Sequence, residues 1–265
     1  MPGEPVDHQS LAAQLEDAWQ SRQPILPPSE QDKLSTIADA YQVQMEWNAI
    51  RLAAGDSVIG RKIGLTSKAV QDQLGVDQPD FGNLWSSRLI AADATRAEAS
   101  AEMLIQPRVE GELAFRIGGP LRGPGVTLQE VLAATDAVAA AFEVVDSRIA
   151  DWRITIADTI ADDASFGALC VGRWTKLHRQ ADLRSLGMIV LKNGRPAAEG
   201  VGAAALGHPA RAVAWLVNKL AEFEVALEAG DIVMSGALAK VVPAARGDIF
   251  TLEMGDQSPL SLRFT

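Results

Sequence analysis

Apolar residues follow a helical spacing near the N-terminus and a strand-like alternation in the rest of the chain. Residues 8–22 and 35–54 carry apolar positions on one helical stripe, and Ser35 is the expected N-cap of the second segment. From the stretch VIGRKIGLT onwards, short apolar runs separated by turn residues indicate strands. We therefore predict a helical cap over residues 1–56 and a β-rich domain over residues 57–265.

The second half of the chain mixes strands and helices unevenly. Thr127, followed three residues later by Glu130, has the pattern of a capping box, and the His-Pro pair at 208–209 opens an amphipathic helix. The Asn-Gly pair at 193–194 is typical of a two-residue hairpin, and the stretches DIVMSGAL, GDIFTLEM and PLSLRFT indicate strands. Locally paired strands with irregularly placed helices favour the α+β class over a doubly wound parallel sheet.

The most informative stretch is RVEGELAFRI, residues 108–117, in which apolar residues occupy every second position. One face of this predicted strand is apolar, and Glu110 and Glu112 project from the other face, close enough to share one cation. Adjacent glutamates are also typical of an exposed sheet face. A second predicted strand, FEVVDSRI at 142–149, favours a site because it places Glu143 among hydrophobic neighbours, where charges are rarely buried unless they are paired or coordinating.

These three carboxylates, with no histidine or thiolate beside them, would form a hard oxygen site. Such a site favours Mg²⁺ or Mn²⁺ over zinc or copper, and it leaves coordination positions for water or substrate. A structural Ca²⁺ site is the alternative, but Ca²⁺ loops usually take their ligands from one irregular segment rich in Gly and Asp. The pattern therefore indicates a metal site that takes part in catalysis.

Composition excludes several classes of function. The chain has 24 Lys and Arg against 34 Asp and Glu and no basic run, so we expect it to bind neither nucleic acid nor an anionic membrane. Its apolar stretches stay shorter than the roughly 20 residues that span a bilayer, and its start lacks a signal-peptide pattern, so we expect a cytoplasmic protein. The single cysteine, Cys170, lies in an apolar run and is expected in the core.

Several long motifs follow one another in an order that resembles a known family. They are GRKIGLTSKAVQDQLGVDQPDFG, PRVEGELAF, FEVVDSRIADWRI and DTIADDASFG. From about residue 36 to the C-terminus the chain resembles the fumarylacetoacetate hydrolase superfamily, and within it the 2-hydroxypenta-2,4-dienoate hydratases. The resemblance implies a mixed β-sheet roll or sandwich with an N-terminal helical cap, and an Mg²⁺ or Mn²⁺ ion held by Glu110, Glu112 and Glu143.

The resemblance also implies the partners of this protein. The substrate would be a small 2-hydroxydienoate, hydrated to a 4-hydroxy-2-oxo acid in aromatic meta-cleavage catabolism. The assembly would be a cyclic homo-oligomer, pentameric or decameric, that in some members associates with the decarboxylase of the same pathway. We expect a monocarboxylic substrate, because Lys62, the obvious motif residue that could meet a distal carboxylate, is already committed near the metal. Arg148 and Arg153 also lie in the motifs and leave a dicarboxylate as the alternative.

Three residues with ordinary local patterns gain catalytic roles from the resemblance. Lys62 lies on an alternating strand, where a solvated lysine is the plain interpretation, but by resemblance it reaches the active site and balances the carboxylates or exchanges a proton. Asp80, after a proline, has the pattern of a turn residue, and by resemblance it orients or deprotonates the attacking water. Ser165 either caps a helix end or donates a hydrogen bond to substrate.

Two other segments bear on the substrate pocket. Ser235, Gly236 and Ala237 end a predicted strand, and by resemblance these small residues let backbone N–H groups approach the substrate carboxylate. The chain has two aspartates at 162–163 where the family pattern has Asp-Asn. An extra carboxylate near this loop changes its hydrogen bonding.

Other functions compete with hydration. A 2-oxo-3-hexenedioate (4-oxalocrotonate) decarboxylase of the sister branch would use the same metal site, but QPDFG and DWRITIADTIAD resemble the hydratases more, and the decarboxylase pattern lacks an aspartate equivalent to Asp80. An acylpyruvate hydrolase would need a base, typically histidine, near the metal, and no histidine falls within the motifs. In a non-catalytic, metal-stabilised binding protein the pocket residues would be dispensable.

Overall fold

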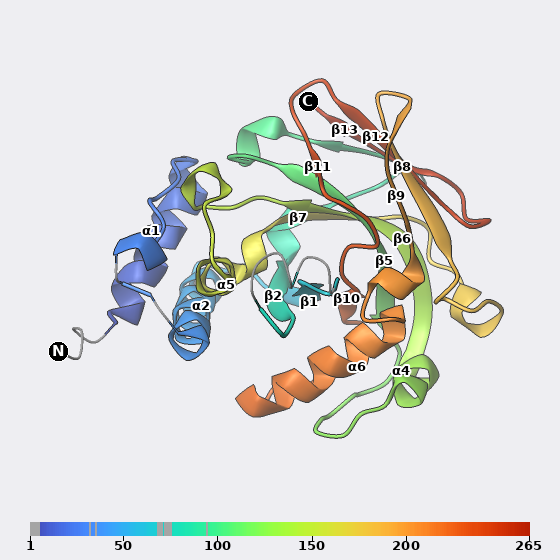
Figure 1. Ribbon diagram of the computed structural model, residues 1–265, viewed down its shortest axis with the longest axis horizontal. Coiled ribbons are helices and arrows are strands. Elements are labelled where there is room, and N and C mark those ends of the chain that lie inside the picture. Colours follow the sequence, from blue (N-terminus) through green and yellow to red (C-terminus); the bar gives the residue numbers. More distant parts are fainter. Residues whose placement is uncertain (1–5, 32, 35, 68–70, 72–75, 94) are drawn as a thin grey trace.

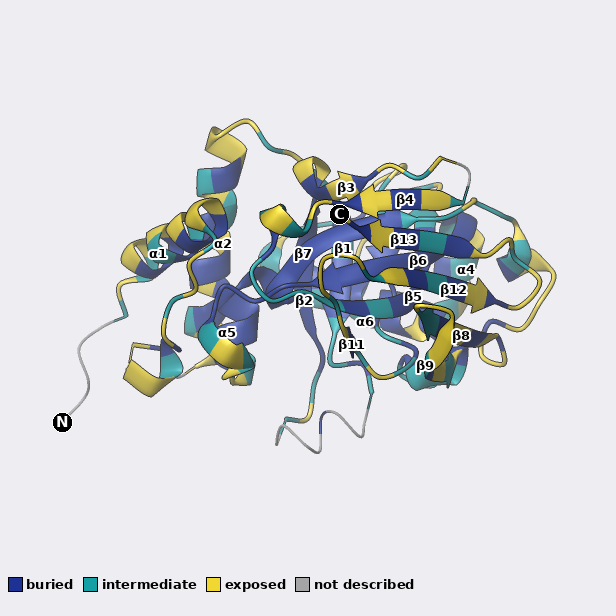
Figure 2. Ribbon diagram, turned by 90° about the horizontal axis from the view of Figure 1, so that it is seen from above, coloured by how far each residue is buried: buried dark blue, intermediate teal, exposed yellow. Residues whose placement is uncertain are grey.

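The computed structural model describes residues 6–265 apart from 32, 35, 68–70, 72–75 and 94. Two β-sheets pack face to face, and the N-terminal helices lie together at one end of this sandwich (Figure 1). Figure 2 shows from above the same N-terminal helices beside one end of the sheets. This arrangement confirms the predicted α+β class and the predicted sandwich of mixed sheets. No helix among the described residues is long and apolar enough to cross a bilayer.

The larger sheet has eight strands among the described residues. In spatial order they are β2 (Asp80–Trp85), β1 (Val58–Gly64), β10 (Ile232–Met234), β5 (Arg108–Ile117), β6 (Thr135–Val145), β7 (Phe166–Val171) and β3 (Leu89–Ile90), while β11 (Val242–Pro243) also pairs with β5. β1 runs parallel to β10, and β3 runs parallel to β7, whereas the other pairs are antiparallel. Cys170 is buried in β7, as predicted.

The smaller sheet comes mainly from the C-terminal half of the chain. Its order is β4 (Arg96–Ala99), β13 (Leu260–Phe264), β12 (Ile249–Met254), β8 (Gly187–Lys192) and β9 (Arg195–Val201). The predicted hairpin joins β8 to β9, with Asn193 and Gly194 both at positive φ, as a tight hairpin turn requires. The three C-terminal stretches predicted as strands contain β10, β12 and β13.

The predicted strand at 142–149 is partly wrong in its bounds. β6 begins earlier than predicted, at Thr135, and ends at Val145, so residues 146–149 of the predicted strand lie outside it. The physical reason is a change of partners after Val145. There the Asp146 carboxylate accepts the backbone N–H groups of Ile105 and Gln106, at 3.0 and 2.7 Å, and this ties the chain to a neighbouring loop.

Helices begin where the capping residues predict. α4 (Leu128–Ala134) starts with the Thr127–Glu130 capping box, and His208 caps α6 (Pro209–Leu220) through its side chain. The N-terminal helices are α1 (His8–Ser21) and α2 (Ile37–Ala53). Thr36 caps α2, whereas the predicted cap Ser35 lies outside the described residues.

The N-terminal helices are anchored beside β2, at the edge of the larger sheet. Gln44 of α2 is buried and donates hydrogen bonds of 2.9 Å to the carbonyls of Phe81 in β2 and Ile160 in α5 (Ile156–Ala161). Tyr41 stacks on the Phe81 ring with 4.8 Å between ring centroids. These contacts hold α2 and α5 against the end of the sheet where β2 begins.

The two sheets pack closely at Gly111 in β5. A β-carbon there would lie within 3.1 Å of three side chains of the smaller sheet, those of Met188, Val190 and Leu252. This face of β5 is therefore the packed face of the sandwich. Since strand residues alternate between faces, Glu110 and Glu112 point away from the smaller sheet.

Gly111→Val should destabilise the fold, because its side chain would push the sheets apart in a close-packed core. We expect the free energy of unfolding to fall by about 1–3 kcal/mol, the usual cost of overpacking. Thermal unfolding of the purified variant measures this loss. Gly119→Ala is the matched control, because a β-carbon at Gly119 meets no atom within 4 Å. An unchanged melting midpoint for Gly111→Val would contradict the close approach described here.

Candidate metal centre and active site

Strand register brings the three predicted metal ligands together. In the antiparallel pair of β5 and β6, Glu110 lies directly opposite Glu143. Glu112 follows two residues later on the same face of β5. Each of the three offers a carboxylate oxygen, and these oxygens all lie within 4.8 Å of one another. Two strands of one sheet therefore present three carboxylates to a single point.

The three carboxylates lie in an environment that disfavours negative charge. Glu112 and Glu143 are fully buried, and Glu110 is half-buried. Burial, together with the charge of Glu143, raises the pKa of Glu110 to about 7 and the pKa of Glu112 well above its usual range. A bound divalent cation would offset both the desolvation and the mutual repulsion of these groups.

Several carboxylate oxygens in this cluster are left without hydrogen bonds. Within the described part of the chain, Glu143 Oε2 and Glu112 Oε1 accept no hydrogen bond, whereas Glu143 Oε1 lies 2.7 Å from the Lys62 ammonium. The other Glu112 oxygen accepts the backbone N–H of Gly236 at 2.8 Å. Buried polar atoms normally have partners, so free carboxylate oxygens that face one another fit the ligand set of a hard divalent cation.

Gly236 is suited to this contact by its backbone. Its φ of +94° lies in the region that favours glycine, and a β-carbon there would lie 2.4 Å from Thr66 Oγ1. The resemblance directed the small residues 235–237 at the substrate carboxylate. In the structure the Gly236 N–H donates a hydrogen bond to Glu112, a predicted metal ligand, and the role of residues 235–237 towards the substrate stays a prediction.

Lys62 brings one positive charge to the cluster. Its Nζ lies 2.7 Å from Glu143 Oε1 and donates a hydrogen bond of 2.7 Å to the carbonyl of Ala164. Burial alone would lower the pKa of Lys62, but the charges of Glu143 and Asp80 outweigh burial and raise it. Lys62 is therefore a buried cation of the site, and the solvated-lysine interpretation is wrong.

Asp80 does not lie in a turn, so that interpretation of its pattern is also wrong. It is the first residue of β2, is buried, and pairs with Gly64 of β1. A β-carbon on Gly64 would lie 2.1 Å from Asp80 Oδ1, so the glycine makes room for the carboxylate. Burial and the nearby charge of Glu143 raise the pKa of Asp80 to about 6, although Lys62 opposes the shift. A carboxyl group with a pKa near neutrality is suited to proton transfer.

A pocket of about 680 Å³ opens beside the cluster. Among the residues predicted from the sequence, those that line it are Lys62, Asp80, Glu110, Ser165 and Ala237. Ser235 is completely buried, and its Oγ finds no hydrogen-bond partner in the described residues. The Ser165 hydroxyl donates a hydrogen bond to Asp162 Oδ2 at 3.1 Å. The site thus joins a carboxylate cluster to a substrate-sized cavity.

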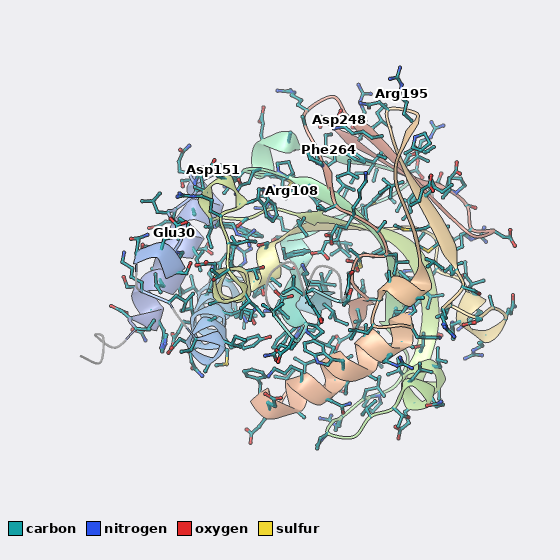
Figure 3. All side chains as sticks on the ribbon, viewed as in Figure 1. Glu30, Arg108, Asp151, Arg195, Asp248 and Phe264 are labelled. Atoms are coloured by element: carbon teal, nitrogen blue, oxygen red, sulfur yellow. The ribbon has the colours of Figure 1, made fainter. Side chains whose placement is uncertain are left out.

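Sequence reasoning missed further residues of the pocket wall. Arg108, at the start of β5 (Figure 3), stacks its guanidinium 4.2 Å from the ring centroid of Trp152, and Lys240 is an exposed residue of the same wall. Arg108 could have been found, because it lies two residues before Glu110 and so shares its strand face. Lys240 lies in a loop, and no pattern in the sequence points to it. The pocket wall therefore carries two positively charged side chains, Arg108 and Lys240, besides Lys62.

The chain is similar to known proteins over most of its length. Residues 57–264 match the family model described as fumarylacetoacetate (FAA) hydrolase C-terminal. A 2-hydroxyhexa-2,4-dienoate hydratase of Comamonas testosteroni is 46% identical over 251 residues, which cover 95% of each chain. A 2-hydroxypent-2,4-dienoate hydratase of Pseudomonas putida is 48% identical over 216 residues, 82% of this chain and 96% of the relative.

A solved structure has nearly the same fold. It is the 4-oxalocrotonate decarboxylase from Pseudomonas putida G7, complexed with magnesium and adipate. The two chains are 36% identical, the TM-score is 0.92, and the match covers 97% of each. A relative with this backbone therefore binds a divalent cation, in agreement with the donor set found here.

Mn²⁺ should raise the melting midpoint of the wild-type protein, because the ion binds the folded cluster and relieves the repulsion of its carboxylates. Glu143→Ala removes a ligand rather than a packing residue, so we expect a folded variant whose midpoint responds much less to Mn²⁺. Glu253→Ala, which removes an exposed carboxylate of β12, is the matched control and should respond as the wild type does. Equal Mn²⁺ responses in wild type and Glu143→Ala would mean that Glu143 is not a ligand.

Proposed function

The chain belongs to the fumarylacetoacetate hydrolase family, and from this premise we propose that it is a hydro-lyase that adds water to a 2-hydroxy-2,4-dienoate. The product is a 4-hydroxy-2-oxo acid, and the reaction belongs to the meta-cleavage catabolism of aromatic compounds. The observation that carries this function is the identity of 46% and 48%, over most of the chain, to hydratases of six- and five-carbon dienoates, respectively. The carboxylate cluster and the buried Asp80 carboxyl, which lines the adjoining pocket together with Glu110, supply chemistry suited to it.

Glu110, Glu112 and Glu143 would hold Mg²⁺ or Mn²⁺, since all three offer hard oxygen ligands. When bound, the cation stabilises negative charge that develops on the C2 oxygen of the substrate. Lys62 keeps one positive charge beside Glu143 and so limits the excess negative charge of the cluster. The Gly236 N–H fixes the direction of the Glu112 carboxylate.

Asp80 is the residue we assign to the attacking water. It lines the pocket, and its raised pKa lets it take a proton from water near neutral pH and return it afterwards. Ser165 lines the same pocket and offers a hydroxyl to the substrate. Ala237 lies on the wall beside Gly236, where its small side chain leaves room for the substrate.

A decarboxylase is the second candidate function. The observation in its favour is the TM-score of 0.92 and the 36% identity to 4-oxalocrotonate decarboxylase. The higher identity to hydratases and the buried carboxyl of Asp80 favour water addition. Product analysis separates the two functions, because decarboxylation releases CO₂ from a dicarboxylate and hydration does not.

Asp80→Asn keeps the shape of the side chain but cannot take a proton. We expect it to bind Mn²⁺ normally and to hydrate the dienoate roughly a hundredfold more slowly than the wild type, the usual scale for one positioned base. The earlier ketonisation should continue, and proton NMR in deuterated buffer should show deuterium entering C5. Asp77→Asn, at an exposed position nearby in the chain, is the control. An unchanged hydration rate in Asp80→Asn would exclude this role, and loss of both exchange and hydration would assign Asp80 to the earlier step.

A monocarboxylic dienoate should be the better substrate. A carboxylate at the far end would lose solvation in the pocket, Lys62 is already bonded to Glu143, and only Arg108 and Lys240 of the wall could meet it. We expect kcat/KM for 2-hydroxypenta-2,4-dienoate to exceed that for a seven-carbon diacid by roughly tenfold or more. A strong preference for the diacid that disappears in Lys240→Met would overturn this expectation and assign Lys240 to the distal carboxylate.

A further inference from the structure

The loop between α5 and β7 has an unusual backbone. Asp163, Ala164 and Ser165 all have positive φ, at 52°, 51° and 53°. Residues with side chains rarely adopt this left-handed region, so three in succession need support from their surroundings. The loop also carries two groups of the active site. The Ala164 carbonyl accepts the hydrogen bond of Lys62, and Ser165 lines the pocket.

The Asp163 side chain fastens this loop to β2. Its Oδ1 accepts the backbone N–H of Asn83 at 2.8 Å and the Asn83 side-chain amide at 3.1 Å. Its Oδ2 accepts the indole N–H of Trp85 at 2.8 Å. The strand and the loop touch closely, since a β-carbon on Gly82 would lie 2.3 Å from the Asp163 carbonyl oxygen. Asp163, Asn83 and Trp85 are all buried.

The partners of Asp163 match a carboxylate at this position. Asn83 and Trp85 offer three N–H donors to this side chain. A carboxylate only accepts hydrogen bonds and satisfies all three, whereas an asparagine would turn its own N–H₂ group against at least one donor. A donor facing a donor in a buried site is costly.

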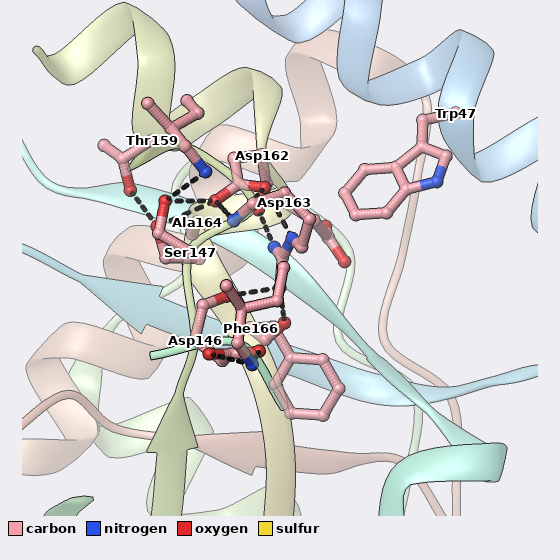
Figure 4. A network of polar contacts seen from close by, with 12 residues as sticks. Trp47, Asp146, Ser147, Thr159, Asp162, Asp163, Ala164 and Phe166 are labelled. Atoms are coloured by element: carbon pink, nitrogen blue, oxygen red, sulfur yellow. Dashed lines mark hydrogen bonds and ion pairs between the residues drawn. The ribbon is translucent and has the colours of Figure 1, made fainter. Parts of the chain in front are cut away.

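The neighbouring Asp162 fastens the other side of the loop. Its carboxylate accepts hydrogen bonds from Arg148 Nε at 2.6 Å, Ser147 Oγ at 2.9 Å and Ser165 Oγ at 3.1 Å (Figure 4). Asp162 therefore binds the loop to the chain after β6, while Asp163 binds it to β2. Only the Asp163 contacts reach the strand that begins with Asp80.

We propose that Asp163 is a positioning residue for Lys62. By holding the left-handed loop on β2, it places the Ala164 carbonyl where it receives the Lys62 ammonium and thereby fixes that ammonium beside Glu143. Asp163 itself does not line the pocket. This inference rests on the proposed function only in its kinetic test, which measures the rate of dienoate hydration.

Three variants test it: Asp163→Asn, Trp85→Phe and the double variant. In Asp163→Asn the amide opposes a donor and the loop shifts, so we expect kcat for dienoate hydration to fall by roughly tenfold to a hundredfold, with KM and Mn²⁺ affinity within roughly threefold of the wild type. In the double variant the amide N–H₂ group introduced at position 163 faces the phenyl ring introduced at position 85. The amide oxygen at position 163 still accepts hydrogen bonds from both Asn83 donors. We therefore expect kcat to return to within roughly threefold of Trp85→Phe.

Crystal structures of the wild type and Asp163→Asn supply a readout that does not depend on activity. We expect the hydrogen bond from Lys62 to Ala164 to be lost in the variant. If the wild type fails to hydrate dienoates but this bond is lost, the proposed function fails and the positioning role stands.

The proposal is overturned if Asp163→Asn keeps wild-type kcat and the Lys62 contact, or if the folded double variant is as slow as Asp163→Asn. Should Asp163→Asn not fold, the double variant decides. If the kcat of the double variant is near that of Trp85→Phe, the positioning role of Asp163 is supported. If the double variant folds but is slow, the proposal is overturned.

Discussion

The central constraint in this structure is the repulsion of three carboxylates inside one sheet. The antiparallel register of β5 and β6 sets Glu110 opposite Glu143, with Glu112 on the same face, and several of their oxygens accept no hydrogen bond from the described residues. Such an arrangement is unfavourable unless positive charge enters it. Lys62 supplies one charge, and a divalent cation would supply the rest. The surrounding backbone is arranged to keep these groups in place.

Glycines make that arrangement sterically possible. Gly111 lets the smaller sheet pack closely on the face of β5 opposite the carboxylates. Gly64 leaves room for the Asp80 carboxylate, and Gly236 brings a backbone N–H to Glu112. In each case a β-carbon would collide with a neighbouring atom, so these positions serve close approach rather than flexibility. The sandwich thus carries the carboxylate cluster on one face of β5 and β6, and the pocket lies beside it.

The sequence predicts the parts of this site that depend on local periodicity. Alternation in β5 placed Glu110 and Glu112 on one face, and capping residues located the starts of α4 and α6. Features that depend on distant contacts were not predictable in this way. Asp80 resembles a turn residue until β2 pairs with β1, and the left-handed loop at Asp163 becomes explicable only beside Trp85. Resemblance to a family directed attention to Asp80, but the reason for its altered pKa is burial, which the sequence does not display.

The central claim is that one divalent cation binds between β5 and β6 and that the chemistry takes place beside it. The most direct test is an anomalous-scattering difference map, recorded at the manganese absorption edge, from crystals of the protein soaked in Mn²⁺. We expect a single strong peak for Mn²⁺ in contact with oxygens of Glu110, Glu112 and Glu143. A peak bound elsewhere, or no peak while the three side chains keep their positions, would contradict it.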